Sequence, residues 1–135
     1  LPKALYELAS GVERVFGLAC RVELDDEARV GDEAVATHVY RIAQEAVNNA
    51  VKHARASSIR VRLSHRDGTV RLVVEDDGVG LPELRDDAEG LGLRIMGYRA
   101  RMIGGRLDVR RGETGGTRVV CTFSDETDRR RENQS

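Results

Sequence analysis

One stretch of sequence decides the fold: Ile59-Arg60-Val61-Arg62-Leu63-Ser64-His65-Arg66-Asp67-Gly68-Thr69-Val70-Arg71-Leu72-Val73-Val74. Apolar and polar residues alternate on both sides of Asp67-Gly68, which is the period of a strand with one buried face. An Asp-Gly pair between two such runs is a strong signal for a tight hairpin turn. We therefore predict two antiparallel strands in the middle of a sheet.

Helical periodicity flanks this hairpin in three segments, at residues 2–17, about 32–54 and 90–105. Asp32 is placed to cap the second of these helices. Shorter alternating runs predict further strands at residues 19–24, 107–109 and 118–123. The order of elements favours an α+β fold: a two-layer α/β sandwich whose mixed, mostly antiparallel sheet carries its helices on one face.

The chain of 135 residues has room for one hydrophobic core. We expect one domain over residues 1–124. Residues 125–135 are polar and charged without apolar anchors, which predicts a disordered tail. Residues 81–89 lose all periodicity between flanking glycines and are predicted to form a mobile loop.

The charge balance restricts the possible partners. Lys and Arg number 22 and Asp and Glu number 23, for a formal net charge of -1, which argues against nucleic acid and anionic membranes as partners. No signal peptide and no apolar run of ~20 residues is visible, so a soluble, cytoplasmic domain is expected, with membrane anchoring of a parent protein left open. Cys20 and Cys121 fit free thiols in a reducing cytosol, and a buried disulfide between strands is the alternative.

A polar strip runs along the predicted helix at residues 32–54, and it consists of Arg41, Glu45, Asn48, Asn49, Lys52 and His53. Most such strips are solvated helix surface. Two adjacent amides in the middle of a helix are poor helix formers, however, which indicates that a local function compensates. Glu45 and Asn49 lie four residues apart, so both share one helix face and can meet a metal ion.

Three glycine motifs follow the strip. Asp76-Asp77-Gly78-Val79-Gly80 ends the second hairpin strand, where a carboxylate and two glycines suit hydrogen bonding to a base, although an ordinary turn has the same composition. Gly90-x-Gly92 opens a predicted helix and fits either a hinge or a phosphate site. Gly115-Gly116-Thr117 is most simply a hairpin turn.

These four elements occur in an order that makes a resemblance specific. The chain resembles the catalytic, ATP-binding domain of bacterial sensor histidine kinases, which has the Bergerat fold and belongs to the ATPase superfamily shared with DNA gyrase, mismatch-repair ATPases and a heat-shock chaperone. Residues 40–54 match its N box, residues 76–80 its G1 box, residues 90–96 its G2 box and residues 115–117 the motif that closes the adenine pocket. The sequence of residues 44–53 resembles that of the histidine kinases that signal to nitrate-type response regulators.

The resemblance implies ATP and Mg²⁺ as cofactors and assigns a role to each matching residue. Asn49 would hold Mg²⁺ on the phosphates, Asp76 would accept the adenine amino group, and Thr117 would support Asp76 through a shared water or hydroxyl contact. The remaining matches would contact the base or the phosphates: Gly78 and Gly80 at the pocket floor, Gly90, Gly92 and Leu93 in the G2 box, and Lys52 and His53 beside the phosphates. For His53 a packed or surface role is equally open.

Glu45 stands where many histidine kinases carry Asn and where the related ATPases carry a catalytic glutamate. A carboxylate near a metal-bound phosphate can deprotonate or orient an attacking imidazole or water. We therefore hypothesise a general-base or water-orienting role for Glu45.

The implied reaction transfers the γ-phosphate of ATP to a histidine and then to an aspartate of a response regulator. His38, His53 and His65 do not match the acceptor pattern of a His followed by an acidic residue, so the acceptor is expected on an upstream dimerisation domain of a homodimeric parent. This domain alone is therefore not expected to complete the reaction. A second departure from the family pattern is Tyr98, which stands where relatives often have Glu. The same pocket serves anti-sigma-factor serine kinases and ATPase switches, which are the alternative. Intact Asn49 and Asp76 speak against a degenerate module that has lost nucleotide binding.

Overall fold

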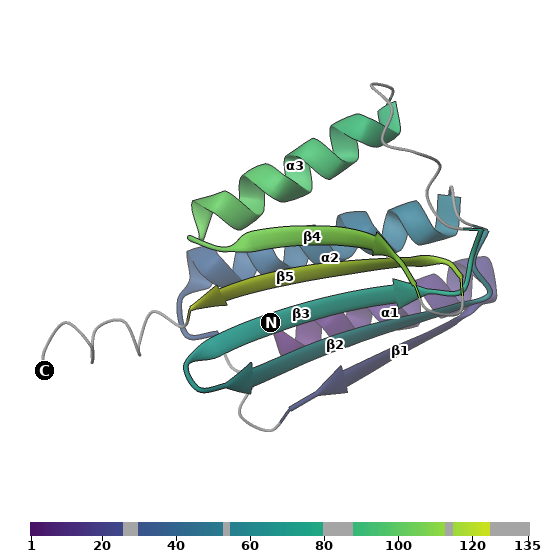
Figure 1. Cartoon of the computed structure of the whole chain (residues 1–135). Helices are drawn as coiled ribbons and strands as arrows, with labels where there is room; N and C mark the ends of the chain where they lie inside the picture. The colour runs from purple at the N-terminus through teal and green to yellow at the C-terminus, as the bar shows by residue number, and fades with distance from the viewer. Residues whose placement is uncertain (26–29, 53–54, 80–87, 113–114, 125–135) are drawn as a thin grey trace, which may run out of the picture.

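The computed structural model describes residues 1–25, 30–52, 55–79, 88–112 and 115–124 (Figure 1), and for residues 88–91 it describes the backbone alone. The described chain forms three helices and five strands. In chain order they are α1 (Pro2–Phe16), β1 (Ala19–Leu24), α2 (Glu33–Lys52), β2 (Ser58–Arg66), β3 (Thr69–Asp76), α3 (Ala88–Met102), β4 (Arg106–Arg111) and β5 (Thr117–Ser124).

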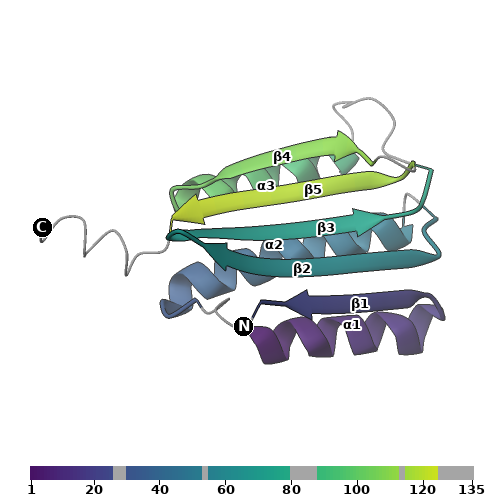
Figure 2. The ribbon, with the colours of Figure 1, turned by 60° about the horizontal axis from the view of Figure 1, so that its bottom comes forward.

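The sheet confirms the predicted architecture. Its five strands lie in the order β1-β2-β3-β5-β4. β1 pairs with β2 in parallel, and the other neighbouring pairs are antiparallel. The described helices lie on one face: Figure 2 shows α2 and α3 behind the strands, and Figure 1 shows α1 behind β2 and β3. The other face carries no helix of the described residues. The molecule is the predicted two-layer α+β sandwich.

The hairpin at Asp67-Gly68 forms as predicted. Asp67 and Gly68 both have positive φ, at 52° and 77°. This is the conformation of a type I′ turn, whose twist matches that of the flanking strands. Arg66 and Thr69 pair directly across the turn, and this register carries to the helix-covered face the alternating apolar residues Ile59, Val61 and Leu63 of β2 and Val70, Leu72 and Val74 of β3.

The helix boundaries fall close to the predicted ones. Asp32 Oδ1 accepts hydrogen bonds from the backbone N–H of Ala34 at 2.8 Å and of Val35 at 3.1 Å, which confirms the predicted N-cap. α3 begins at Ala88, so the predicted start at Gly90 is two residues late, and the predicted loop is wrong for residues 88–89. Ala is the best helix former, which favours the earlier start.

Several predictions fall outside the described residues. These are the mobile loop as far as residue 87, the disordered tail at 125–135 and the end of the second helix at residues 53–54.

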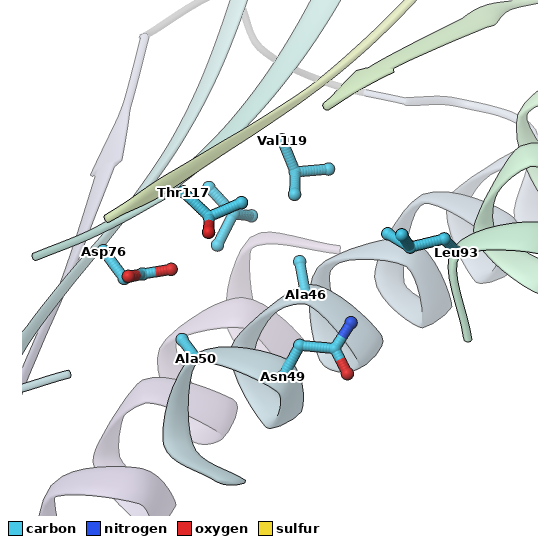
Figure 3. Close-up of a pocket in the computed structure, with 8 residues that line it drawn as sticks. Ala46, Asn49, Ala50, Asp76, Leu93, Thr117 and Val119 are labelled. Carbon is cyan, nitrogen blue, oxygen red and sulfur yellow. The ribbon is translucent and has the colours of Figure 1, made fainter. Parts of the chain in front are cut away.

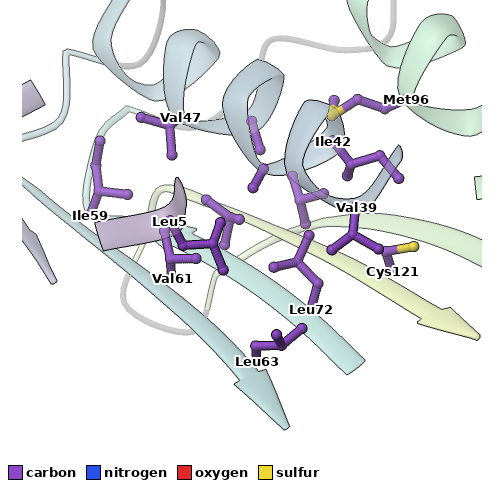
Figure 4. Packing of buried hydrophobic residues seen from close by; sticks show 14 of the residues in the cluster. Leu5, Val39, Ile42, Val47, Ile59, Val61, Leu63, Leu72, Met96 and Cys121 are labelled. Atoms are coloured by element: carbon purple, nitrogen blue, oxygen red, sulfur yellow. The ribbon is translucent and has the colours of Figure 1, made fainter. Parts of the chain in front are cut away.

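The hydrophobic core fills the space between the helices and the sheet (Figure 4). Val39 and Ile42 of α2, Leu72 of β3 and Met96 of α3 are fully buried there. The predicted apolar stripe of α2 therefore faces the sheet, and the polar strip of the same helix faces away from the sheet.

Both cysteines are buried, and both are free thiols. This confirms the thiol prediction over the disulfide. Burial raises the pKa of Cys20 and of Cys121 to about 11, with Glu13 adding to the shift at Cys20, so both thiols are protonated at neutral pH. No helix among the described residues is long and apolar enough to cross a bilayer.

Candidate functional site

A pocket opens where α2 and α3 meet the ends of β3 and β5 (Figure 3). Four predicted site residues line it, each from a different element: Asn49, Asp76, Leu93 and Thr117. Its apolar walls are Ala46, Ala50, Val74 and Val119. The enclosed space is about 10 Å³, close to one water-sized sphere, so a purine ring enters only when the walls move apart.

Asp76 is held rigidly at the end of β3. The N–H of Gly78 donates to Asp76 Oδ1 at 2.8 Å, and the backbone N–H of Thr117 also donates to this carboxylate. Burial raises the pKa of Asp76 above its ordinary value, while these two hydrogen bonds oppose the shift. The carboxylate is thus an acceptor that is oriented by the backbone and only partly solvated.

Gly116 lies directly against Asp76. Its φ is +73°, and a Cβ at this position would collide with the backbone oxygen of Asp76. Only glycine accepts both the left-handed conformation and the close approach. The motif that reads as a simple hairpin turn in the sequence therefore fixes the distance between β5 and the carboxylate.

The Thr117 hydroxyl has no hydrogen-bond partner within the described part of the chain, although its side chain is buried. The predicted hydroxyl contact with Asp76 is not among the hydrogen bonds of the described residues, and Thr117 reaches this carboxylate through its backbone N–H instead. A buried hydroxyl without a partner is costly. Its position beside Asp76 in the pocket fits a ligand or a water as the missing partner.

Asp77, the next residue, holds two strands together and does not line the pocket. Its carboxylate accepts from the Ser57 N–H at 2.8 Å, the Ser57 hydroxyl at 2.7 Å and the Ser58 N–H at 2.9 Å. These hydrogen bonds, led by the Ser57 hydroxyl, lower the pKa of Asp77. Asp77 thus ties the end of β3 to the start of β2 and leaves Asp76 to face the pocket.

Glu45 lies one helical turn before Asn49 on α2, half-buried and outside the pocket lining. Its carboxylate lies against Gly92 of α3. The amide oxygen of Asn49 and the nearby carboxylate of Glu45 are hard oxygen donors of the kind that Mg²⁺ takes together with substrate phosphates. No group of three or more His, Cys, Asp or Glu side chains that could hold a metal by itself exists among the described residues.

The other predicted residues are not in the pocket lining or lie outside the described chain. Lys52 is exposed at the last turn of α2, Gly78 is half-buried after β3, and Gly90 lies in the first turn of α3. His53 and Gly80 lie outside the described residues.

Sequence reasoning missed the four apolar wall residues. They share the buried faces of α2, β3 and β5 with ordinary core residues, so periodicity alone could not separate them.

Comparison with known proteins agrees with this geometry. The family described as Histidine kinase-, DNA gyrase B-, and HSP90-like ATPase matches residues 34–127. Nitrate/nitrite sensor protein NarX of Escherichia coli (strain K12) is 39% identical over 108 residues, which are 80% of this chain and 18% of NarX. The chain thus spans less than a fifth of that relative.

Solved structures show the same fold. The histidine kinase domain of the Erythrobacter litoralis EL346 blue-light activated histidine kinase has a TM-score of 0.76 and 31% identity, covering 91% of this chain and 60% of that one. The ATP binding domain of PrrB from Mycobacterium tuberculosis has a TM-score of 0.72 at 22% identity, covering 91% and 92%, a likeness of fold. The family match confirms the resemblance drawn from the motifs, and the chain belongs to the histidine kinase-, DNA gyrase B- and HSP90-like ATPase family.

Proposed function

We propose that this chain is the catalytic domain of a sensor histidine kinase, which binds Mg-ATP and transfers the γ-phosphoryl group to a histidine on a separate dimerisation domain. The observation that carries the proposal is the convergence of Asn49, Asp76, Leu93 and Thr117 on one pocket from four elements. Family membership and the identity to NarX support the same reaction class.

The adenine ring is assigned to the space between Asp76 and the apolar walls. Asp76 accepts a hydrogen bond from the exocyclic amino group, and its carboxylate already carries two backbone donors that fix its direction. The unpartnered Thr117 hydroxyl bonds the base or a water beside it. Guanine presents a carbonyl where adenine presents its amino group, so the carboxylate repels it.

The phosphates are assigned to the polar strip of α2. Asn49 would hold Mg²⁺, with Lys52 and His53 beside the phosphates and Gly90 and Gly92 close to them in the first turns of α3. Bound Mg²⁺ would neutralise charge that develops on the transferred group. The chain's own contribution is to orient the nucleotide so that its γ-phosphorus faces an incoming imidazole.

In the transfer step, the bond from the γ-phosphorus to the bridging oxygen of ADP breaks, and a phosphorus–nitrogen bond to the acceptor imidazole forms. Glu45 is the group proposed to take the imidazole N–H proton or to orient the ring. Its half-buried position one turn from Asn49 supports that role.

The acceptor histidine and the response regulator are proposed partners outside this chain. His38 lies on α2 with its Nδ1 3.4 Å from Arg99 Nη1, and His65 lies within β2. Both histidines therefore belong to structural elements of this domain, and neither is the proposed acceptor. The proposed parent is a homodimer that presents its acceptor histidine to this domain on the cytoplasmic side, where ATP is available.

The direct test is transfer of radiolabel from γ-labelled ATP to the full-length parent. The proposal expects a product that is acid-labile and base-stable, as a phosphorus–nitrogen bond requires, and expects much less of it in the Asp76→Asn variant when ATP is limiting. An acid-stable product would indicate a serine acceptor and would overturn the histidine kinase assignment.

A further inference from the structure

The helix-free face of the sheet is strongly basic, although the whole chain is close to neutral. By strand alternation this face carries three carboxylates, Glu23, Glu75 and Asp108, and eight arginines: Arg21, Arg60, Arg62, Arg66, Arg71, Arg106, Arg110 and Arg118. The face therefore has an excess of five positive charges, while the chain as a whole carries -1. We call these eleven residues the arginine face.

The strand register places some of these arginines directly opposite one another. Arg21 of β1 pairs with Arg60 of β2, and Arg118 of β5 pairs with Arg110 of β4. Both pairs lie in one row across the sheet, in which Glu75 is the carboxylate. Like charges opposite each other destabilise a sheet, and the carboxylates that contact Arg60, Arg110 and Arg118 offset this cost only in part, because Arg21 has no such contact among the described residues.

The carboxylates of the arginine face are already engaged. Glu23 contacts Arg60 at 3.5 Å and Arg62 at 3.7 Å, and Glu75 contacts Arg62 at 3.6 Å and Arg118 at 3.4 Å. Asp108 pairs with Arg110 at 2.8 Å. No ion pair between described residues involves the other four arginines, Arg21, Arg66, Arg71 and Arg106.

The composition of this face selects among anionic partners. It carries no aromatic side chain for stacking on bases and no Asn or Gln for reading their edges. It also has no large apolar side chain that could enter a membrane. The interspersed carboxylates would face the phosphates of a nucleic acid or a lipid, whereas a protein surface can place its own cations against them.

We infer that the arginine face docks a carboxylate-rich surface of another protein. A second copy of this chain does not fit face to face, because the excess charge repels itself. Five strands about 4.8 Å apart and six to nine residues long give roughly 500 Å². That area matches the small, transient class of protein interface, so binding is weak and sensitive to salt.

The test uses a fluorescein-labelled peptide of ten glutamates and the full 135-residue chain. Fluorescence anisotropy measures its binding at low and at physiological salt. The variant is the double charge reversal Arg21→Glu with Arg110→Glu, which turns both like-charged cross-strand pairs into opposite-charged ones. It also removes the Arg110–Asp108 ion pair, which is exposed and therefore contributes little, so the melting temperature should change little. The matched control is Lys3→Glu with Arg101→Glu, which makes the same change in net charge on exposed helix positions.

The inference expects the peptide to bind at low salt, to weaken at physiological salt, and to lose tenfold or more in affinity in the sheet variant and less than twofold in the control. Equal losses in the two variants would reduce the effect to net charge and overturn the inference. Tighter binding of a 20-base-pair DNA duplex or of phosphatidylserine vesicles, lost in the same sheet variant, would assign the face to phosphates instead. None of these outcomes depends on ATP binding, so the proposed function stands or falls separately.

Discussion

The carboxylate of Glu45 occupies the place that a side chain at Gly92 would need. A Cβ built on Gly92 would lie 2.5 Å from Glu45 Oε1 and 3.4 Å from its carboxyl carbon. Glycine inside a helix costs about 0.5–1 kcal/mol relative to alanine, so helix propensity alone would favour alanine here. The space required by Glu45 accounts for the glycine, and the two residues form one unit between α2 and α3.

Gly92→Ala should therefore displace Glu45 and slow phosphoryl transfer by tenfold or more, because a positioned general base contributes about 10²–10⁴ in rate. The effect should appear in kcat of the full-length parent, with the affinity for ATP nearly unchanged. In a Glu45→Gln background the same substitution should cost nothing further.

Gly97→Ala on the same helix is the matched control. Its added Cβ would meet only the flexible end of Arg101, at 3.4 Å from Nη1. It should raise the free energy of unfolding by about 0.5–1 kcal/mol and leave transfer intact. Additive losses from Gly92→Ala and Glu45→Gln would show that Gly92 does not act through Glu45.

Asp76 and Asp77 should respond in opposite ways to substitution. Asp76→Asn removes a charge whose burial is unfavourable, so the empty protein should keep or gain stability at neutral pH. Its affinity for ATP should fall by about 2 kcal/mol, roughly thirtyfold, because an amide donor can then face the adenine amino group. Calorimetric titration measures the ATP affinity, and urea unfolding of the same sample measures the stability. An Asp76→Asn variant that loses stability but keeps its ATP affinity would contradict the assignment of Asp76 to the adenine site.

Asp77→Ala should lower stability and leave ATP affinity unchanged. The pKa of Asp77 is lowered in the folded state, so its contribution is present above the unfolded pKa and is lost as pH falls through the folded one. The stability difference between wild type and variant should therefore shrink steadily when urea unfolding is repeated from neutral pH down to about pH 3. A difference that stays constant over this range would show that the Asp77 charge is not what stabilises the turn.

Thr117→Val tests the unpartnered hydroxyl. The substitution keeps the shape and removes a buried polar atom that has no partner in the described chain, so the empty protein should gain about 1 kcal/mol of stability. Its affinity for ATP should fall about three- to tenfold if the hydroxyl bonds the nucleotide or its water. Thr122→Val, on the helix-free face of the same strand, is the control. It should change both the stability of the empty protein and the affinity for ATP by less than Thr117→Val does.

The fold could be predicted from the sequence to the extent that each element carried a local signal. The hairpin was marked by Asp67-Gly68, and the start of α2 by the Asp32 cap, because turn and cap chemistry act over a few residues. The start of α3 was placed two residues late, since a polar stretch beside glycines reads the same in a loop and in a first helical turn. The parallel pairing of β1 with β2 has no local signal at all, because residues far apart in sequence decide it.

The candidate site could be predicted only in part, and that part came from the resemblance to a family and not from local sequence signals. Asp76 and Asp77 are chemically identical in sequence, and their different roles follow from which one the strand directs toward the pocket and which toward Ser57. Only the resemblance to a family distinguished them beforehand. The contact between Glu45 and Gly92 could not be predicted by either route, because it depends on how closely two helices pack.

Asn49→Ala should abolish the dependence of ATP binding on Mg²⁺. Alanine removes the amide oxygen proposed to hold the ion, and the adenine contacts of Asp76 remain. Titrations with Mg²⁺ and with a chelator should therefore give different affinities in the wild type and the same weak affinity in the variant. Asn48→Ala, one position away and outside the pocket lining, is the control, and an equal loss there would point to helix stability as the cause.

The most direct measurement is a crystal structure of the chain with Mg²⁺ and a non-hydrolysable ATP analogue. The pocket should widen to admit the base, with the adenine amino group within hydrogen-bond distance of Asp76 and Mg²⁺ on the Asn49 amide oxygen. A nucleotide bound elsewhere on the molecule, or a pocket that stays closed at saturating analogue, would contradict this prediction.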